Sequence, residues 1–266
     1  MTTEKLYLAW QDQKNRNWWP IGILTHEDDQ KYRFRYTRGA EILKEKGIFK
    51  TFAGMCDLDL VYESKDLFPL FSNRVIQETR PEYKRYLNWL DSFVDTHDPL
   101  TFLSITEGIK VSDNLEVFSC PQEKIKGRYE AFFLVHGLRY LTESSIERIN
   151  QLQKGERLYL IYDMQNDYDD KAVALRTNDP VEIVGYCPRY LSREILDLFD
   201  KTKNVKVTVE RINHEAPLHV RLLCRITARW PEDFVPCSDE KFRPIVDDLE
   251  KEIETASKDH EMIKHK

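Results

Sequence analysis

The sequence predicts an α+β protein, with a mixed N-terminal part and a strand-rich second part. In the first part, apolar stretches that alternate with a period of two are followed by stretches with helical spacing. In the second part, apolar stretches end in turns rich in Gly, Asn and Asp, which is typical of β structure. A chain of 266 residues that is 41% hydrophobic can bury one or two ordinary cores.

The N-terminal part is expected to begin with three strands and a helix. The third strand alternates basic with aromatic residues, which places its aromatic side chains on one sheet face and its basic side chains on the other. We interpret the basic face as a solvated strand face rather than a nucleic-acid interface, because such alternation is common in half-exposed sheets. Gly47 is typical of a helix end. The expected strands are 6–10, 19–24 and 31–36, and the expected helix is 39–46.

Two short helices and a strand are expected next, at 66–74, 80–87 and 115–118. Pro81 suits the first turn of the second helix. Pro99 and Gly108 interrupt a polar segment, so we expect a linker there. Phe242, Ile245, Leu249 and Ile253 form a thin apolar stripe, which predicts a short tail helix at 247–255. The expected organisation is an N-terminal α+β domain at 1–95, a linker at 96–127, a β domain at 128–230 and an acidic and mixed tail at 231–266.

The composition excludes several classes of protein. No apolar run approaches the roughly 18 residues that span a membrane, and the start of the chain lacks the pattern of a secretory signal. We therefore expect a soluble cytoplasmic protein. The cysteines are odd in number and form no C-x-x-C pair, which favours buried reduced thiols over a structural zinc site or another cofactor. They are Cys56, Cys120, Cys187, Cys224 and Cys237.

The net charge of −6 argues against a nucleic-acid partner, but the distribution of charge allows one. Residues 201–229 contain seven Lys and Arg residues against two Glu residues. Backbone phosphates respond to a local basic face rather than to the charge of the whole chain.

Polar and aromatic residues follow three strands of the second part, where a β scaffold usually holds a ligand. Tyrosine stacks on bases, a carboxylate accepts a hydrogen bond from a free hydroxyl but repels a phosphate, and arginine donates to phosphate. A role as ordinary turn and core residues stays open, because Asn and Asp are common in turns. A calcium loop is excluded, since Tyr168 and Ala174 stand where glycine and glutamate are needed. The candidate DNA-binding residues are Arg139, Tyr140, Asn166, Tyr168, Asp169, Tyr186 and Arg189.

The segments FFLVHGLRYL, LIYDMQNDYDDKAVAL and EIVGYCPRYLSREI, in this order, resemble the HIRAN domain. This is a small β-barrel module, found alone in bacteria and fused to DNA-remodelling helicases in eukaryotes. The resemblance implies an all-β, OB- or SH3-like barrel of about six strands that binds the 3′ end of single-stranded DNA. Met164 and Asp167 stand where the family often has prolines, and Asp167 adds a negative charge.

The resemblance also implies roles for the candidate residues. Tyr140 and Tyr168 would contact the terminal bases, and Asp169 would bind the 3′-hydroxyl. Arg139 and Arg189 would hold the backbone, while Tyr186 would line the pocket.

The first 95 residues resemble the N-terminal subdomain of HipA-type proteins. The likeness rests on the order W-P-x-G-x-L-T, Y-R-F-x-Y and F-P-L-F-x-N-R, at 19–25, 32–36 and 68–74. In that family the subdomain is an α+β cap beside a kinase domain. This chain has no glycine-rich phosphate loop and no catalytic-loop pattern, so kinase activity is not implied.

The sequence therefore predicts a non-catalytic protein that binds single-stranded DNA, without metal or cofactor. The alternative is a regulatory protein that engages a HipA-kinase-like or other partner through residues 1–95. A magnesium-dependent nuclease or phosphatase using Asp163, Asp167 and Asp169 is the least favoured class, because no general base accompanies these carboxylates.

Overall fold

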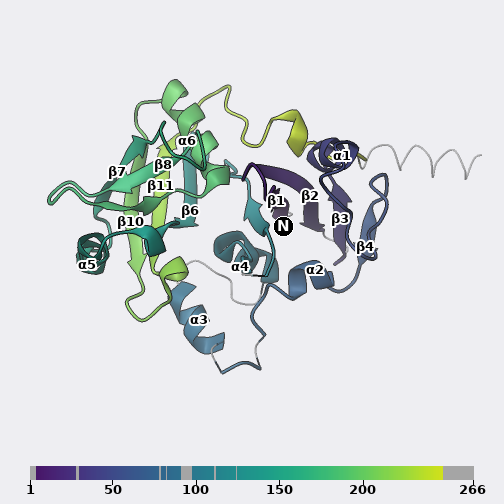
Figure 1. Cartoon of the computed structure of the whole chain (residues 1–266), viewed down its shortest axis with the longest axis horizontal. Coiled ribbons are helices and arrows are strands. Elements are labelled where there is room, and N and C mark those ends of the chain that lie inside the picture. Colours follow the sequence, from purple (N-terminus) through teal and green to yellow (C-terminus); the bar gives the residue numbers. More distant parts are fainter. Residues whose placement is uncertain are drawn as a thin grey trace, which may run out of the picture.

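The structure is a computed structural model in which two antiparallel sheets lie side by side (Figure 1). It describes residues 4–27, 30–77, 79–81, 83–90, 98–110, 112–123 and 125–247. The predicted α+β class is confirmed. The expected tail helix at 247–255 falls almost wholly on residues 248–255, which lie outside the described residues.

The first sheet has the strand order β4-β3-β2-β1-β5, and every neighbouring pair is antiparallel. The alternation in the sequence explains its main strands, because one face of β3 buries Phe34 and Tyr36 in the core. The expected strands and helices are present, although the helices after residue 66 are shorter or shifted. The elements are β1 (Glu4–Gln11), β2 (Trp18–His26), β3 (Tyr32–Tyr36), α1 (Arg38–Glu45), β4 (Tyr62–Ser64), α2 (Pro69–Ser72) and α3 (Tyr83–Leu90).

The basic face of β3 is less solvated than we expected. Arg35 is buried, and the Nζ atom of Lys31 and the Nε atom of Arg33 lie 3.2 and 3.0 Å from the Glu63 carboxylate of β4. The Glu63 carboxylate on the neighbouring strand thus forms ion pairs with Lys31 and Arg33.

The segment expected to be a linker, 96–127, contains a packed helix and a strand of the first sheet. These are α4 (Pro99–Thr106) and β5 (Leu115–Ser119). Asp98 caps α4 by accepting hydrogen bonds from the backbone of Leu100 and Thr101, so Pro99 begins the helix instead of breaking it. One side of α4 packs in the core of the first sheet and the other packs against the second sheet.

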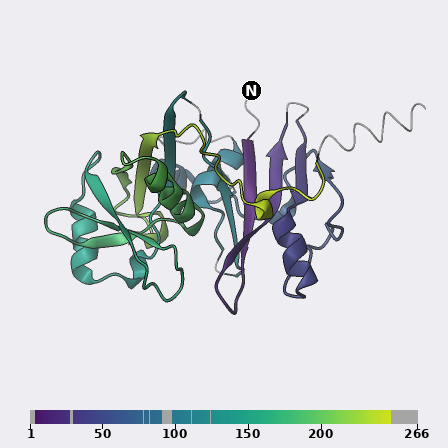
Figure 2. The same ribbon diagram turned by 90° about the horizontal axis from the view of Figure 1, so that it is seen from above.

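The second sheet has the strand order β6-β11-β10-β7-β8-β9 and curls into a half-barrel (Figures 1 and 2). Its two edges meet where His136 and Tyr186 exchange backbone hydrogen bonds of 2.9 and 3.0 Å. The expectation of about six strands is confirmed, but the expected all-β character is wrong, because two α-helices pack on the sheet. The elements are β6 (Arg128–Leu134), η1 (Leu138–Tyr140), α5 (Glu143–Gln151), β7 (Arg157–Tyr162), β8 (Val173–Arg176), β9 (Ile183–Tyr186), α6 (Arg189–Lys201), β10 (Lys206–Ile212), η2 (Leu218–Val220) and β11 (Leu222–Arg229).

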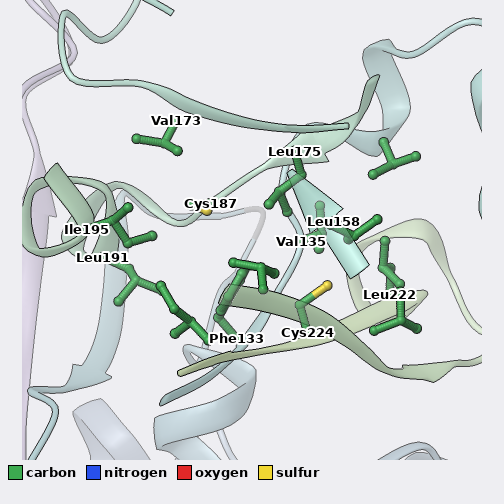
Figure 3. Close-up of a cluster of buried hydrophobic side chains, with 14 of the residues drawn as sticks. Phe133, Val135, Leu158, Val173, Leu175, Cys187, Leu191, Ile195, Leu222 and Cys224 are labelled. Atoms are coloured by element: carbon green, nitrogen blue, oxygen red, sulfur yellow. The ribbon is translucent and has the colours of Figure 1, made fainter. Parts of the chain in front are cut away.

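The core of the half-barrel joins side chains from the inner sheet face with the apolar side of α6 (Figure 3). Leu191, Ile195 and Leu198 recur at helical spacing and are almost fully buried, so they fix the helix on the barrel. Gly185 of β9 has φ +129°, and a Cβ there would lie 2.4 Å from Val135 Cγ1. Glycine therefore allows β9 to approach the chain segment that follows β6.

The chain after β11 crosses back to the first sheet, as the yellow segment shows in Figures 1 and 2. The amides of Arg38 and Ile245 donate hydrogen bonds of 2.9 and 3.0 Å that join this returning segment, residues 231–247, to the α1–β3 region. It contains η3 (Glu240–Phe242), and Phe242 packs edge-on against Tyr7 with ring centroids 5.3 Å apart. Phe234 of the same segment lies in the core of the half-barrel, so the returning segment packs against both sheets.

The cysteines differ in part from the expected set of buried thiols. Cys187 and Cys224 are free and buried, as predicted. The expectation is wrong for Cys56, which is exposed, and for Cys120 and Cys237, which form a disulfide across 117 residues of sequence. The two segments meet only in the folded chain, so the spacing of cysteines in the sequence carried no signal of the pair.

None of the described helices has the length and apolar character that crossing a bilayer requires.

Candidate nucleic-acid interface

The loop between β7 and β8 is shaped by the side chain of Asn166. Its Oδ1 atom accepts hydrogen bonds from the backbone amides of Tyr168 and Asp169, at 3.0 and 3.1 Å. Its Nδ2 atom donates to Asp163 Oδ2 at 3.1 Å. Asn166 therefore has the turn role that Asn often takes, and it also fixes the direction of the two candidate residues that follow it.

Asp163 connects this loop to β9. The same Oδ2 atom that accepts from Asn166 also accepts the hydroxyl of Tyr186, at 3.1 Å. Partial burial and the neighbouring Asp163 carboxylate raise the pKa of Tyr186, so the phenol stays protonated as a donor. Asp163 was not among the candidate DNA-binding residues of the sequence analysis. Its place at a strand end, three residues before Asn166, is the sequence signal that could have indicated a role in this loop.

Asp169 lies between its own loop and the start of α6. One carboxylate oxygen accepts the amide of Lys171 at 3.0 Å, and the other lies 3.7 Å from Arg189 Nε. The Asp169 and Arg189 side chains are 15% and 26% exposed, so the pair faces solvent from a partly enclosed position. Burial lowers the pKa of Arg189, while the Asp169 charge opposes that change.

Two tyrosines of the set are largely exposed. Tyr140 is 76% exposed and Tyr168 is 63% exposed, so much of each ring is open to a ligand. The alternative of a core aromatic is therefore wrong for Tyr140. The guanidinium of Arg139 lies 4.7 Å from the centre of the Tyr140 ring, which brings a positive charge beside that face.

The structure brings five of the seven candidate residues together, four by direct contacts and Tyr186 through Asp163. The five are Asn166, Tyr168, Asp169, Tyr186 and Arg189. Arg139 and Tyr140 form a pair on η1, which begins beside Tyr186, because a Cβ on Gly137 would lie 3.3 Å from that ring. Asp167 is exposed in the same loop. The charge of Asp167 thus faces solvent.

A buried polar cluster lies beneath this surface, between α4, β5 and the barrel. Glu107 accepts a hydrogen bond from the Tyr190 hydroxyl at 3.2 Å and lies 2.7 Å from His136 Nε2. Burial lowers the pKa of His136, but the Glu107 carboxylate outweighs it and raises that pKa to about 9. Burial and Glu107 also raise the pKa of Glu116 to about 8.

The two raised pKa values predict that stability falls as the pH rises. His136 and Glu116 both hold protons more tightly in the folded state, so their contributions are full at low pH and are lost as the pH rises toward 9. We expect the free energy of unfolding to fall by roughly 5 kcal/mol between pH 6 and pH 9, because one unit of pKa shift corresponds to about 1.4 kcal/mol and both groups lose bound protons in this range. Urea denaturation at both pH values measures this difference.

A matched pair of variants assigns the pH effect to the buried cluster. Glu116→Gln removes one of the two titrating groups and should make the pH dependence shallower, whereas Glu147→Gln, on the exposed side of α5, should leave it unchanged. An unfolding free energy that rises toward pH 9 contradicts the assignment.

Comparison with known proteins identifies the second part of the chain. Residues 129–231 match the family model described as the HIRAN domain. The chain contains a HIRAN domain. Its bounds coincide with the half-barrel from β6 to the end of β11, and all seven candidate residues lie on it.

Two solved structures are similar to part of this chain. A protein from Lactobacillus plantarum is 21% identical, with 37% of this chain and 95% of that chain covered and a TM-score of 0.31. The HIRAN domain of human HLTF is also 21% identical, with coverage of 40% and 78% and a TM-score of 0.29. A search of curated proteins gave no significant match.

Proposed function

We propose that the HIRAN domain of this chain binds single-stranded DNA and holds a 3′ end. The observation that carries the proposal is the exposed ring of Tyr168 directly before the Asp169 carboxylate, with Arg189 beside it. This arrangement places a stacking surface, an acceptor for a hydroxyl and a donor for phosphate next to one another.

The tyrosines supply most of the affinity in this proposal. A base stacked on an aromatic side chain contributes about 1–3 kcal/mol, with little sequence preference. Tyr140 and Tyr168 each expose a ring of this kind, and Arg139 adds positive charge over the first. Tyr186 is half-buried and held by Asp163, so it forms the wall of the site.

Asp169 supplies the preference for a strand end. The carboxylate oxygen near Arg189 is not used by the turn, and it can accept a hydrogen bond from a 3′-hydroxyl. A 3′-phosphate would bring a second negative charge to the same place and be repelled. Asp167 lies two residues before Asp169, and its side chain is exposed. Its negative charge repels every nearby phosphate, so it weakens DNA binding without favouring either kind of strand end.

Fluorescence anisotropy with labelled oligonucleotides tests this role of Asp169. We expect a 3′-hydroxyl strand to bind about tenfold more tightly than a 3′-phosphate strand, since a hydrogen bond to a charged group contributes about 1.5–3 kcal/mol. Asp169→Asn keeps an oxygen for the Lys171 amide and should remove most of the preference.

Asp167→Asn is the matched control, because it removes an equal charge from an exposed position two residues away. It should tighten binding of both strands and leave their ratio unchanged. Equal affinity of the unchanged protein for both strands, or no binding at about 50 mM salt where electrostatic attraction is strong, would falsify the proposal.

We also propose that the protein acts by binding alone. In the described part of the chain, no group of three or more His, Cys, Asp or Glu side chains is arranged to hold a metal ion. Hydrolysis of labelled DNA on addition of Mg²⁺ would contradict this part of the proposal.

A further inference from the structure

The β1–β2 hairpin of the first sheet touches the DNA-binding loop of the HIRAN domain. The guanidinium of Arg16 lies 5.9 Å from the centre of the Tyr168 ring. The backbone oxygen of Arg16 accepts a hydrogen bond of 2.6 Å from Arg189 Nη1. Two residues of the proposed site are therefore in contact with a turn that lies about 150 residues earlier in the chain.

The turn of this hairpin is internally braced. Asp12 is buried, and its backbone exchanges hydrogen bonds of 2.9 Å with Arg16 and Asn17. Arg16 has φ +62°, in the left-handed region that residues other than glycine seldom adopt. The bracing holds Arg16 in this conformation with its side chain exposed, instead of leaving a free loop.

The hairpin is also fixed relative to the barrel. The rings of Phe118 and Tyr190 stack with centroids 4.4 Å apart, and the Tyr190 hydroxyl donates to Glu107. Phe118 lies on β5, which pairs with β1 of the hairpin, and Tyr190 lies on α6 of the HIRAN domain. The position of Arg16 over Tyr168 is thus set by the packed boundary between the two sheets.

A cavity of about 390 Å³ opens between the hairpin and α6. Its volume falls within the range of about 300–1,000 Å³ that is usual for ligand sites. Trp18 lines one side, and Tyr168, Lys171, Arg189 and Arg193 line the other. Asp169 and Glu194 line the same end of the cavity as Arg189 and Arg193, whereas Asp197 and Asp200 line it at the later turns of α6. With Lys171, the end at the first turns of the helix therefore has three basic side chains against two acidic ones, and the other end is acidic.

The charges of the HIRAN loop alone disfavour a polyanion. Residues 163–170 contain four aspartates and no basic residue. Lys14 and Arg16 stand on the exposed turn of the hairpin, and the guanidinium of Arg16 lies beside the Tyr168 ring. These two cations can offset the negative charge of the loop at the place where a backbone phosphate would lie.

We propose that the β1–β2 hairpin is the second wall of the DNA site, and that Arg16 contacts the phosphate next to the terminal nucleotide. This inference rests on the proposed function of the HIRAN domain. The terminal base lies on Tyr168 with its hydroxyl at Asp169, and the preceding nucleotide lies over the basic end of the cavity. The first domain is then part of the nucleic-acid interface.

The salt dependence of binding tests this wall. Arg16→Gln keeps the backbone oxygen that Arg189 uses and removes one charge. We expect the 3′-hydroxyl strand to bind two- to fivefold more weakly, which is typical of one exposed charge contact. The slope of log K against log salt should fall in magnitude by about 0.7, the value for one phosphate contact on a single strand. The preference for a 3′-hydroxyl should remain, because Asp169 is unchanged.

Arg85→Gln, on the exposed surface of α3, is the matched control and should leave the affinity and the slope unchanged. Urea denaturation shows whether both variants keep the stability of the unchanged protein. If Arg16→Gln behaves like Arg85→Gln while the unchanged protein still prefers a 3′-hydroxyl, the hairpin wall is overturned and the proposed function stands. If the unchanged protein binds neither strand, both are overturned.

Discussion

Gly185→Ala is expected to lower the free energy of unfolding by about 3–5 kcal/mol. A Cβ at this position would lie 2.4 Å from Val135 Cγ1 and 2.7 Å from the backbone oxygen of His136. Overpacking costs about 1–3 kcal/mol, and the φ of +129° adds strain of similar size for a residue with a side chain. The backbone oxygen cannot rotate away as a side chain can, so the edges of the half-barrel must separate.

Gly155→Ala is the control for backbone strain alone, because Gly155 also has positive φ but has no atom within 4 Å of a Cβ. It should cost about 1–2 kcal/mol. Urea denaturation of both variants compares the two losses. Similar losses would mean that the contact between β9 and the segment after β6 is looser than the structure shows.

Loss of the Cys120–Cys237 disulfide is expected to cost about 2–4 kcal/mol. The bond closes a loop of 117 residues and holds the returning segment beside the end of β5. Removing it gives the unfolded chain more freedom and leaves only noncovalent contacts to hold that segment. Cys120→Ser should therefore unfold at a lower urea concentration than the oxidised protein.

Cys56→Ser tests whether the effect belongs to this bond, since Cys56 is free and exposed and its replacement should change little. Adding a reductant should lower the urea concentration at which the unchanged protein unfolds, and it should not change that concentration for Cys120→Ser. Peptide mapping without reductant should recover the linked Cys120 and Cys237 peptides. An unchanged protein that is insensitive to reductant would contradict the prediction.

Most elements of the first sheet could be predicted because their signal is local. The alternation in β3 and the spacing in α1 are visible within a few residues. The role of α4 and β5 could not be predicted in this way, because Pro99 and Gly108 interrupt sequence patterns without necessarily interrupting structure. A fragment of residues 1–95 would lack both elements, and with them an edge strand of the sheet.

The helices of the half-barrel were missed for a different reason. Leu191, Ile195 and Leu198 have helical spacing, which is sufficient to predict α6. We expected an all-β barrel in which Arg189 holds the DNA backbone, and we predicted no helix at this position. Arg189 begins the helix and also lies beside Asp169.

The candidate site could be predicted where residues are close in sequence. Asn166, Tyr168 and Asp169 share a single turn, so their proximity follows from local geometry. Arg16 could not have been included, because its contact with Tyr168 depends on how one sheet packs against the other. Tertiary contacts of this kind leave no periodic pattern in the chain.

The returning segment has a consequence for the order in which the molecule matures during synthesis. Residues 243–245 form backbone hydrogen bonds with Arg38 and Tyr36, and they leave the ribosome after the whole HIRAN domain. Phe242, which packs against the rings of Tyr7 and Phe118, is also synthesised after the HIRAN domain. The nascent first domain therefore carries an uncovered apolar face until translation has passed the barrel, and the contacts between the returning segment and the first sheet are the last that can form.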